Sequence, residues 1–389
     1  MARSLMHVAV ALDGTGWHPA SWLEPGARPG ELLTAGYWAD LVREAERALL
    51  DVVTIEDALA LQSADPAAPD ERTDQVRGRL DATLVAARVA PLTRHVGLMP
   101  TVIATHTEPF HIAKAVATLD FVSGGRAGVR VRVSARPDEA ALVGRRTVDP
   151  RDENLLGDLL DEAADHIEVQ RRLWDSWEDD AEIRDAATGR FVDRAKLHYI
   201  DFVGRWFAVR GPSITPRPPQ GQPVVAALAH RSMSYRLVAR SADLAFVTPR
   251  SADDARGIVA AIREEQAAAG RDGETVHVFG DVLVVLDQAP GTAADRRARL
   301  DELAGAPLTS DAPIFAGTPN ELADLLLAWQ DAGLTGVRLR PAGLAHDLPL
   351  ITRALVPELQ RRGAFRTAYE ADTLRGLLGL PRPANRYAA

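Results

Sequence analysis

The sequence contains no cysteine and only two lysines, Lys114 and Lys196, among its 45 basic residues. The absence of cysteine excludes disulfides, thiol nucleophiles, iron–sulfur clusters and thiolate zinc sites. Aromatic residues are scarce, at 5%, and no apolar run approaches the roughly 18 residues that a membrane span needs. The first residues lead straight into a strand-like segment, without the apolar region and cleavage site of a signal peptide. We therefore expect a cytoplasmic protein that does not contact a membrane.

The charge balance argues against a nucleic-acid partner. The formal net charge is −9 at pH 7, and the sequence has no basic stripe with interleaved aromatic residues. Hydrophobic residues make up 46% and charged residues 25%, which is typical of a globular protein with a large core. A length of 389 residues fits either one elaborated α/β barrel or two domains.

Segments with the apolar pattern of buried strands alternate with segments of helical periodicity along most of the chain. This alternation is typical of parallel strands joined by right-handed crossovers. The predicted strands are residues 6–13, 51–57, 95–105, the segment that contains Arg130, and residues 223–229, 244–248, 276–286 and 336–342. Eight such units predict an α/β fold of the (β/α)8 TIM-barrel type, with a doubly wound open sheet as the alternative. Neither a GxGxxG motif after the first strand nor a GxxxxGK[ST] motif is present, which weakens a dinucleotide or P-loop function.

Residues 178–221 interrupt the alternation, directly after a long predicted helix over 153–177. The segment is loop-like, with one short hairpin expected around residues 199–209. It is too short and too poor in apolar residues to hold a core of its own. We therefore predict a single domain over residues 1–389 that contains 178–221 as an insertion.

Two arginines alternate with valines in the stretch "GVRVRVS", residues 128–134. The period of a strand places Arg130 and Arg132 on the face opposite the valines. If the valine face packs against helices, the arginines face the barrel interior, where an unpaired guanidinium costs several kcal/mol. The partner is then a ligand phosphate or a protein carboxylate. The alternative is a solvated strand end with surface ion pairs.

Two further strand ends carry candidate site residues. Glu56 and Asp57 follow the second strand and could serve acid–base chemistry, or act as a helix cap and a solvated carboxylate. Thr101 and Thr105 near the end of the third strand could hydrogen-bond a ligand. The nearby histidines, His106 and His111, do not have a metal-ligand spacing, and we predict no metal site.

The turn after the strand at 223–229 is a candidate phosphate site. His230, Arg231 and Ser232 stand where the free N–H groups of the next helix would face an anion. Simple N-capping by Ser232 is the alternative. Without a GxSxG motif we predict no serine triad, and no residue is predicted as the catalytic base.

Several stretches resemble one family, the bacterial luciferase-like flavin monooxygenases. The main one is "PTVIATHTEPFHIAKAVATLDFVSGGRAG", and "GTPNELADLLLAWQDAG" and "VPELQRRGAFRTAYEADTLRGLLGLPRP" also agree. The likeness is greatest to the branch that contains the nitrilotriacetate, pristinamycin and dibenzothiophene-sulfone monooxygenases. It implies a dimeric (β/α)8 barrel that takes reduced FMN from a separate flavin reductase and uses O2 to oxygenate a small molecule. In such enzymes the flavin carries the reaction, and the protein orients it and excludes water.

The resemblance places flavin contacts at particular positions. Asp57, Thr101 and Thr105 match the family, whereas Arg130 stands where the family has a flavin-contacting asparagine. Glu56 replaces an alanine. The paired serines of the family's phosphate turn fall at His230 and Arg231, and its arginine–tyrosine pair falls at Leu159 and Leu160.

These departures leave three hypotheses. In the first, the site binds FMN, and arginine and histidine side chains replace hydroxyls around the phosphate, which arginine binds as a bidentate donor. In the second, internal pairs such as Glu56–Arg130 fill the pocket of a chain without a cofactor. That chain is a non-catalytic partner subunit in a heterodimer with a homologue, or a flavin-independent enzyme. In the third, the cofactor is a deazaflavin, whose acidic tail also suits arginines.

Two long loops are expected to cover the barrel. The loop after the first strand and the 178–221 insertion are expected to cover the pocket, because barrel loops set specificity. We predict Trp17 and Trp22 as apolar walls of the substrate pocket, beside Glu56 and Arg132. Packing against the barrel rim is the alternative for both tryptophans.

Overall fold

Parallel strands close into a barrel in the computed structural model, which describes residues 4–63, 65 and 68–388. Among these residues the order around the barrel is β1-β2-β3-β4-β9-β10-β11-β13, and β13 pairs with β1 to close it. The barrel strands are β1 (His7–Leu12), β2 (Val52–Ile55), β3 (Gly97–Ile103), β4 (Gly128–Arg132), β9 (Val224–Leu228), β10 (Leu244–Val247), β11 (His277–Leu286) and β13 (Gly336–Pro341). All eight predicted strands, and the (β/α)8 barrel, are confirmed.

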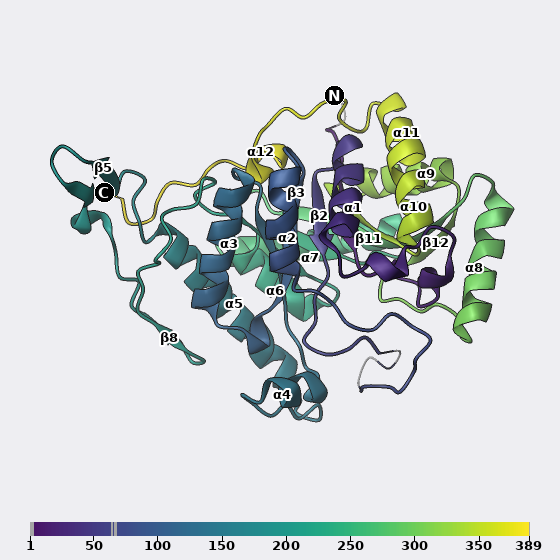
Figure 1. The fold of residues 1–389 in the computed structure, drawn as a ribbon, viewed down its shortest axis with the longest axis horizontal. Helices are drawn as coiled ribbons and strands as arrows, with labels where there is room; N and C mark the ends of the chain where they lie inside the picture. Colours follow the sequence, from purple (N-terminus) through teal and green to yellow (C-terminus); the bar gives the residue numbers. More distant parts are fainter. Residues whose placement is uncertain (1–3, 64, 66–67, 389) are drawn as a thin grey trace.

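Helices surround the barrel and connect its strands (Figure 1). They are α1 (Ala35–Arg47), α2 (Ala82–Val89), α3 (Pro109–Ser123), α4 (Pro137–Val143), α5 (Leu155–Asp175), α6 (Ser232–Ser241), α7 (Ala252–Ala268), α8 (Pro290–Ala304), α9 (Pro319–Asp331), α10 (Leu344–Leu350), α11 (Val356–Arg361) and α12 (Leu374–Leu377). A π-helical turn, Ile351–Leu355, joins α10 to α11. None of the helices in the described part of the chain has the length and apolarity needed to cross a membrane.

Polar residues define where several helices begin. Thr318 caps α9 in a reciprocal capping box with Glu321, and Pro319 occupies the first turn. Ser251 and Asp81 accept hydrogen bonds from the first turns of α7 and α2. Local capping of this kind fixes the residue at which each of these three helices begins.

The interior of the barrel is apolar near the N-terminal ends of its strands. Met99, Phe246 and Phe279 pack there with the C-terminal helix α12, whose Leu374 is fully buried. Leu374 needs glycine opposite it, because a Cβ on Gly97 would lie 2.5 Å from its side chain. Helix α12 thus closes this end of the barrel, and Figure 1 shows it at the opposite end of the molecule from α4.

The segment over 178–221 holds two small hairpins. The pair β7 (Phe202–Val203) and β8 (Ala208–Val209) confirms the predicted hairpin. A second pair, β5 (Glu182–Asp185) and β6 (Arg190–Val192), was not predicted, because its strands are charged and largely exposed. The short strand β12 (Ile314–Gly317), which pairs with β11 outside the barrel, was also missed.

A buried histidine makes the barrel sensitive to acid. His277 at the start of β11 donates from Nε2 to the Leu378 carbonyl, at 2.8 Å, and its Nδ1 lies 3.1 Å from the hydroxyl of Thr335. Burial, with the nearby His7, lowers the pKa of His277 to about 4, from an ordinary 6.5. The unfolded chain therefore binds a proton that the folded chain does not, and stability falls as the pH drops below 6.5.

We expect this one group to lower the free energy of unfolding by about 2 kcal/mol at pH 5 relative to pH 7. Urea unfolding at both pH values measures the change. In His277→Gln the difference in the free energy of unfolding between pH 5 and pH 7 shrinks by about that amount. Substitution of the exposed His111 leaves this difference in free energy unchanged. An equal pH dependence in wild type and His277→Gln would contradict the prediction.

Candidate active site at the carboxyl ends of the strands

Arg130 lies inside the barrel, as the alternation in β4 predicts, and is 1% exposed. It pairs with Glu56 and donates from Nε to the hydroxyl of Thr101, its cross-strand neighbour on β3, at 3.0 Å. Burial lowers the pKa of Arg130 to about 9, although Glu56 opposes the shift. Burial alone would raise the pKa of Glu56, but Arg130 and Arg338 outweigh it and hold the pKa below its usual value. Both groups are therefore ionised at neutral pH, and the predicted Glu56–Arg130 pair is confirmed.

The ion pairs continue across the barrel to β11 and β13. Arg338 contacts Glu56 at 3.3 Å and donates from Nε and Nη2 to its cross-strand neighbour Asp281, at 2.8 and 2.7 Å. Asp281 also pairs with Arg340. Although burial opposes the shift, Arg338 and Arg340 hold the pKa of the fully buried Asp281 below its usual value.

A loop residue links the ion pairs to β9. Asp311 accepts from Arg340 at 2.6 Å and lies 2.9 Å from Nδ1 of His230. Against the effect of burial, His230 and Arg340 keep the pKa of Asp311 far below its usual range. The interior therefore contains three arginines, at 130, 338 and 340, and two carboxylates, at 56 and 281, and the exposed Asp311 at its edge supplies a third carboxylate. We call these six residues the ionic layer.

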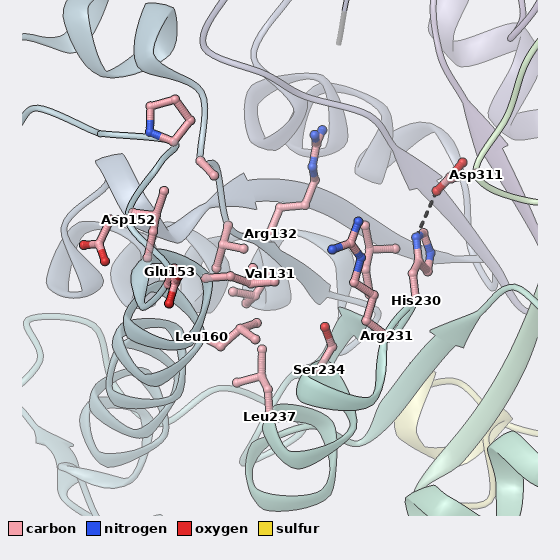
Figure 2. A pocket seen from close by; sticks show the side chains of 16 residues that line it. Val131, Arg132, Asp152, Glu153, Leu160, His230, Arg231, Ser234, Leu237 and Asp311 are labelled. Atoms are coloured by element: carbon pink, nitrogen blue, oxygen red, sulfur yellow. Dashed lines mark ion pairs between the residues drawn. The ribbon is translucent and has the colours of Figure 1, made fainter. Parts of the chain in front are cut away.

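A cavity of about 550 Å³ opens between β4, β9 and the helices α5 and α6. This volume lies within the range of sites for small molecules and cofactors. Figure 2 shows Val131, Leu160 and Leu237 on its walls, with Arg132, Arg231 and Ser234 as polar groups. The other lining residues are Val133, Ala135, Pro150, Asp152, Glu153, Leu155, Leu156, Leu228, His230 and Asp311.

Two arginines of this cavity have no carboxylate partner in the described part of the chain. Arg132, at the end of β4, donates only to the backbone oxygen of Asp57, at 3.3 Å. The guanidinium of Arg231 makes no hydrogen bond or ion pair among the described residues, and the residue is exposed. Because the ionic layer is balanced within itself, these two charges are available to an anion.

The first turn of α6 provides further donors. Arg231 occupies the N-cap position of this ten-residue helix. Its carbonyl accepts from the N–H of Ser234, at 2.9 Å, but its side chain caps none of the first N–H groups. Ser234 lines the cavity, and Ser232 stands exposed at the start of the helix. The positive end of the helix and a free guanidinium thus face the same space, an arrangement that binds phosphate well.

Other residues predicted at the site have partners elsewhere. Asp57 accepts from the backbone N–H groups of Ala58 and Ala82, at 2.8 and 2.9 Å, and burial raises its pKa. Thr105 accepts from the N–H of Ser134, at 2.9 Å. In the structure neither residue lines the 550 Å³ cavity, and nor do Thr101, Arg130 and Glu56.

The two tryptophans predicted as pocket walls lie apart from this cavity. Trp17 lies under Arg340, with the guanidinium 4.8 Å from its ring centroid, and lines a separate cavity of about 200 Å³. Trp22 donates from Nε1 to the Asp74 carbonyl, at 3.0 Å. Their role in a substrate pocket stays a prediction. In the described residues there is no group of histidines and carboxylates that could hold a metal ion.

Sequence reasoning did not select Asp281, Arg338, Arg340 or Asp311. For the first three a signal was available: "GVRLRP" in β13 repeats the alternation of "GVRVRV" in β4, and Asp281 is the one charge within the apolar strand "VFGDVLVVL". Asp311 lies in the loop before β12, where no periodicity indicates its direction.

A closed barrel with a cation-lined cavity at the carboxyl ends of its strands is the architecture of a TIM-barrel enzyme. Comparison with known proteins defines the class further. The family model for luciferase-like monooxygenases matches residues 16–307. The chain is 30% identical to nitrilotriacetate monooxygenase component A of Aminobacter aminovorans, over 100% of this chain and 99% of that protein. It is 29% identical to the N-acetyl-S-(2-succino)cysteine monooxygenase of Bacillus subtilis, over 99% of both chains.

Among solved structures, a riboflavin lyase with a modified FMN superposes with a TM-score of 0.85 at 24% identity, covering 98% of each chain. The chain belongs to the luciferase-like monooxygenase family and is an enzyme of the monooxygenase class.

Proposed function

We propose that this enzyme binds reduced FMN, supplied by a separate flavin reductase, and uses O2 to oxygenate a small organic molecule. The observation that carries the proposal is the pairing, in one cavity, of apolar walls with an unpaired arginine at the first turn of a helix. A flavin mononucleotide has an apolar ring at one end and a dianionic phosphate at the other. Reduced FMN, when bound, supplies the electrons that activate O2.

The residues present fit this cofactor. Arg231, Ser232, Ser234 and the first N–H groups of α6 would hold the phosphate, with charge-assisted hydrogen bonds from the guanidinium. His230, fixed by Asp311, borders the same space. Leu160, Leu228 and Val131 would flank the ring and exclude water from it.

A chain without a flavin is the second candidate, and one observation favours it. Thr101 and Arg130, which the family resemblance places at the flavin, are buried and bonded to each other, and Arg130 is also bonded to Glu56. A flavin bound as the resemblance implies would have to displace these bonds. The first proposal therefore places the cofactor in the cavity between β4, β9, α5 and α6, above the ionic layer towards the carboxyl ends of the strands, and not within that layer.

An anaerobic titration with reduced FMN tests the first proposal. We expect saturable binding to the wild-type protein, and a loss of about 10- to 100-fold in affinity in Arg231→Gln, the range for a charged hydrogen bond. Arg256→Gln, which removes an exposed arginine of α7 that does not line this cavity, is the matched control. Absence of binding at about millimolar FMN would exclude the first proposal. Tight binding of a reduced deazaflavin in its place would support that alternative cofactor.

The partners proposed with this function are O2, the flavin reductase, and a second copy of the chain or a homologue. Exposed apolar side chains on neighbouring helices support a homodimer or heterodimer: Leu84 on α2 is 69% exposed, and Phe121 and Val122 on α3 are also exposed. Light scattering of the purified protein measures the oligomeric state. A cytoplasmic location belongs to the same proposal.

A further inference from the structure

We propose that Arg132 binds an acidic group of the substrate, so that the substrate class is a small, largely apolar molecule with a carboxylate or sulfonate. This inference rests on the proposed function, because it takes the phosphate of FMN to lie at α6. Of the two arginines that line the cavity, Arg231 lies at the N-terminus of α6. Arg132 belongs neither to that helix terminus nor to the ionic layer.

The first argument is the charge balance. Both oxygens of Glu56 are bound, one by Arg130 and the other by Arg338. Asp281 and Asp311 are likewise shared among Arg338, Arg340 and His230. No carboxylate of the ionic layer is left for Arg132.

The second argument is the desolvation of Arg132. Its side chain is partly buried at the end of β4, and the hydrogen bond to the Asp57 carbonyl, at 3.3 Å, does not neutralise its charge. A guanidinium withdrawn from water gains most from a bidentate carboxylate or sulfonate. An anion bound in the cavity would supply the negative charge that the protein itself does not place beside Arg132.

The third argument is the position of Arg132 relative to the phosphate donors. Figure 2 shows the side chain of Arg132 extending from β4 away from Ser234 on α6. Asp152 and Glu153, on the far wall at the start of α5, would repel an acid placed there. The acidic end of a substrate is therefore directed to Arg132, and its apolar body to the walls formed by Val133, Leu155 and Leu156.

The test uses paired probes, 4-phenylbutyrate and 4-phenylbutyramide, titrated calorimetrically into the full chain with and without bound FMN. Benzenesulfonate distinguishes a preference for sulfonate from one for carboxylate. We expect the carboxylate to bind at least tenfold more tightly than the amide to the FMN-loaded protein. In Arg132→Gln that preference disappears, while FMN affinity changes less than threefold.

The matched control is Arg151→Gln, which removes an exposed arginine paired with Asp149 near the same end of the barrel. It should leave both the preference and the FMN affinity unchanged. Equal affinity of wild type for acid and amide would overturn the proposal. So would a loss of FMN affinity in Arg132→Gln as large as that in Arg231→Gln, because Arg132 would then be a phosphate ligand. If FMN never binds but the acid preference depends on Arg132, only the proposed function fails.

Discussion

Replacing Asp281 by asparagine is expected to lower the free energy of unfolding by about 3–5 kcal/mol, the range for breaking a buried ion pair from one side. The substitution keeps the shape of the side chain and removes its charge. Asp281 is fully buried and accepts from Arg338 at 2.8 and 2.7 Å, and it also pairs with Arg340. Two buried guanidinium groups would share a neutral partner in the variant.

Urea unfolding at pH 7 measures this loss. The control is Asp253→Asn, which removes one partner of an ion pair with Arg256 on the exposed surface of α7. Surface substitutions of this kind change stability by about 0.5 kcal/mol or less. A loss below about 1 kcal/mol in Asp281→Asn would show that the ionic layer is not a stabilising unit.

The second large effect is the coupling between Glu56 and Arg130. Glu56→Leu alone leaves Arg130 buried without its carboxylate, and we expect a loss of about 3–5 kcal/mol. Arg130→Met alone leaves Glu56 with a single contact, to Arg338 at 3.3 Å. The double variant replaces both charges with apolar groups, and buried pairs replaced in this way regain most of the lost stability.

A double-mutant cycle, measured by urea unfolding, gives the coupling energy directly. The same four proteins are then titrated with reduced FMN. Because we place the cofactor above this pair, the double variant should bind FMN within about threefold of the wild type. Additive losses in stability would contradict the pairing, and a large loss of FMN affinity in the double variant would make Arg130 a cofactor ligand.

The barrel was predictable because each of its strands is buried on both faces. Strands such as β11, in which all ten residues are buried, carry an apolar run that is visible in the sequence. The missed strands lack that signal: β6 is mostly exposed, and β12 is only partly buried. These strands form because they pair with neighbouring strands, and the local pattern of apolar residues in the sequence does not indicate such pairing.

The site was predictable in part. Alternation in β4 placed Arg130 inside the barrel, and the cost of an unpaired buried charge required an anionic partner, which the sequence left open between a ligand phosphate and a protein carboxylate such as Glu56. That Asp281 and Arg338 face each other depends on the register between β11 and β13, which is a long-range property. Likewise, Asp57 and Thr105 match the family at single positions, yet both accept from backbone N–H groups. A sequence match identifies a residue type but not its partner.

A structure of the protein crystallised with FMN tests most directly whether the cofactor lies above an intact ionic layer. We predict the phosphate against the first turn of α6 and Arg231, the ring between Leu160 and Leu228, and the Glu56–Arg130 pair unbroken. A flavin ring in contact with Arg130, with Glu56 displaced from it, would contradict this arrangement.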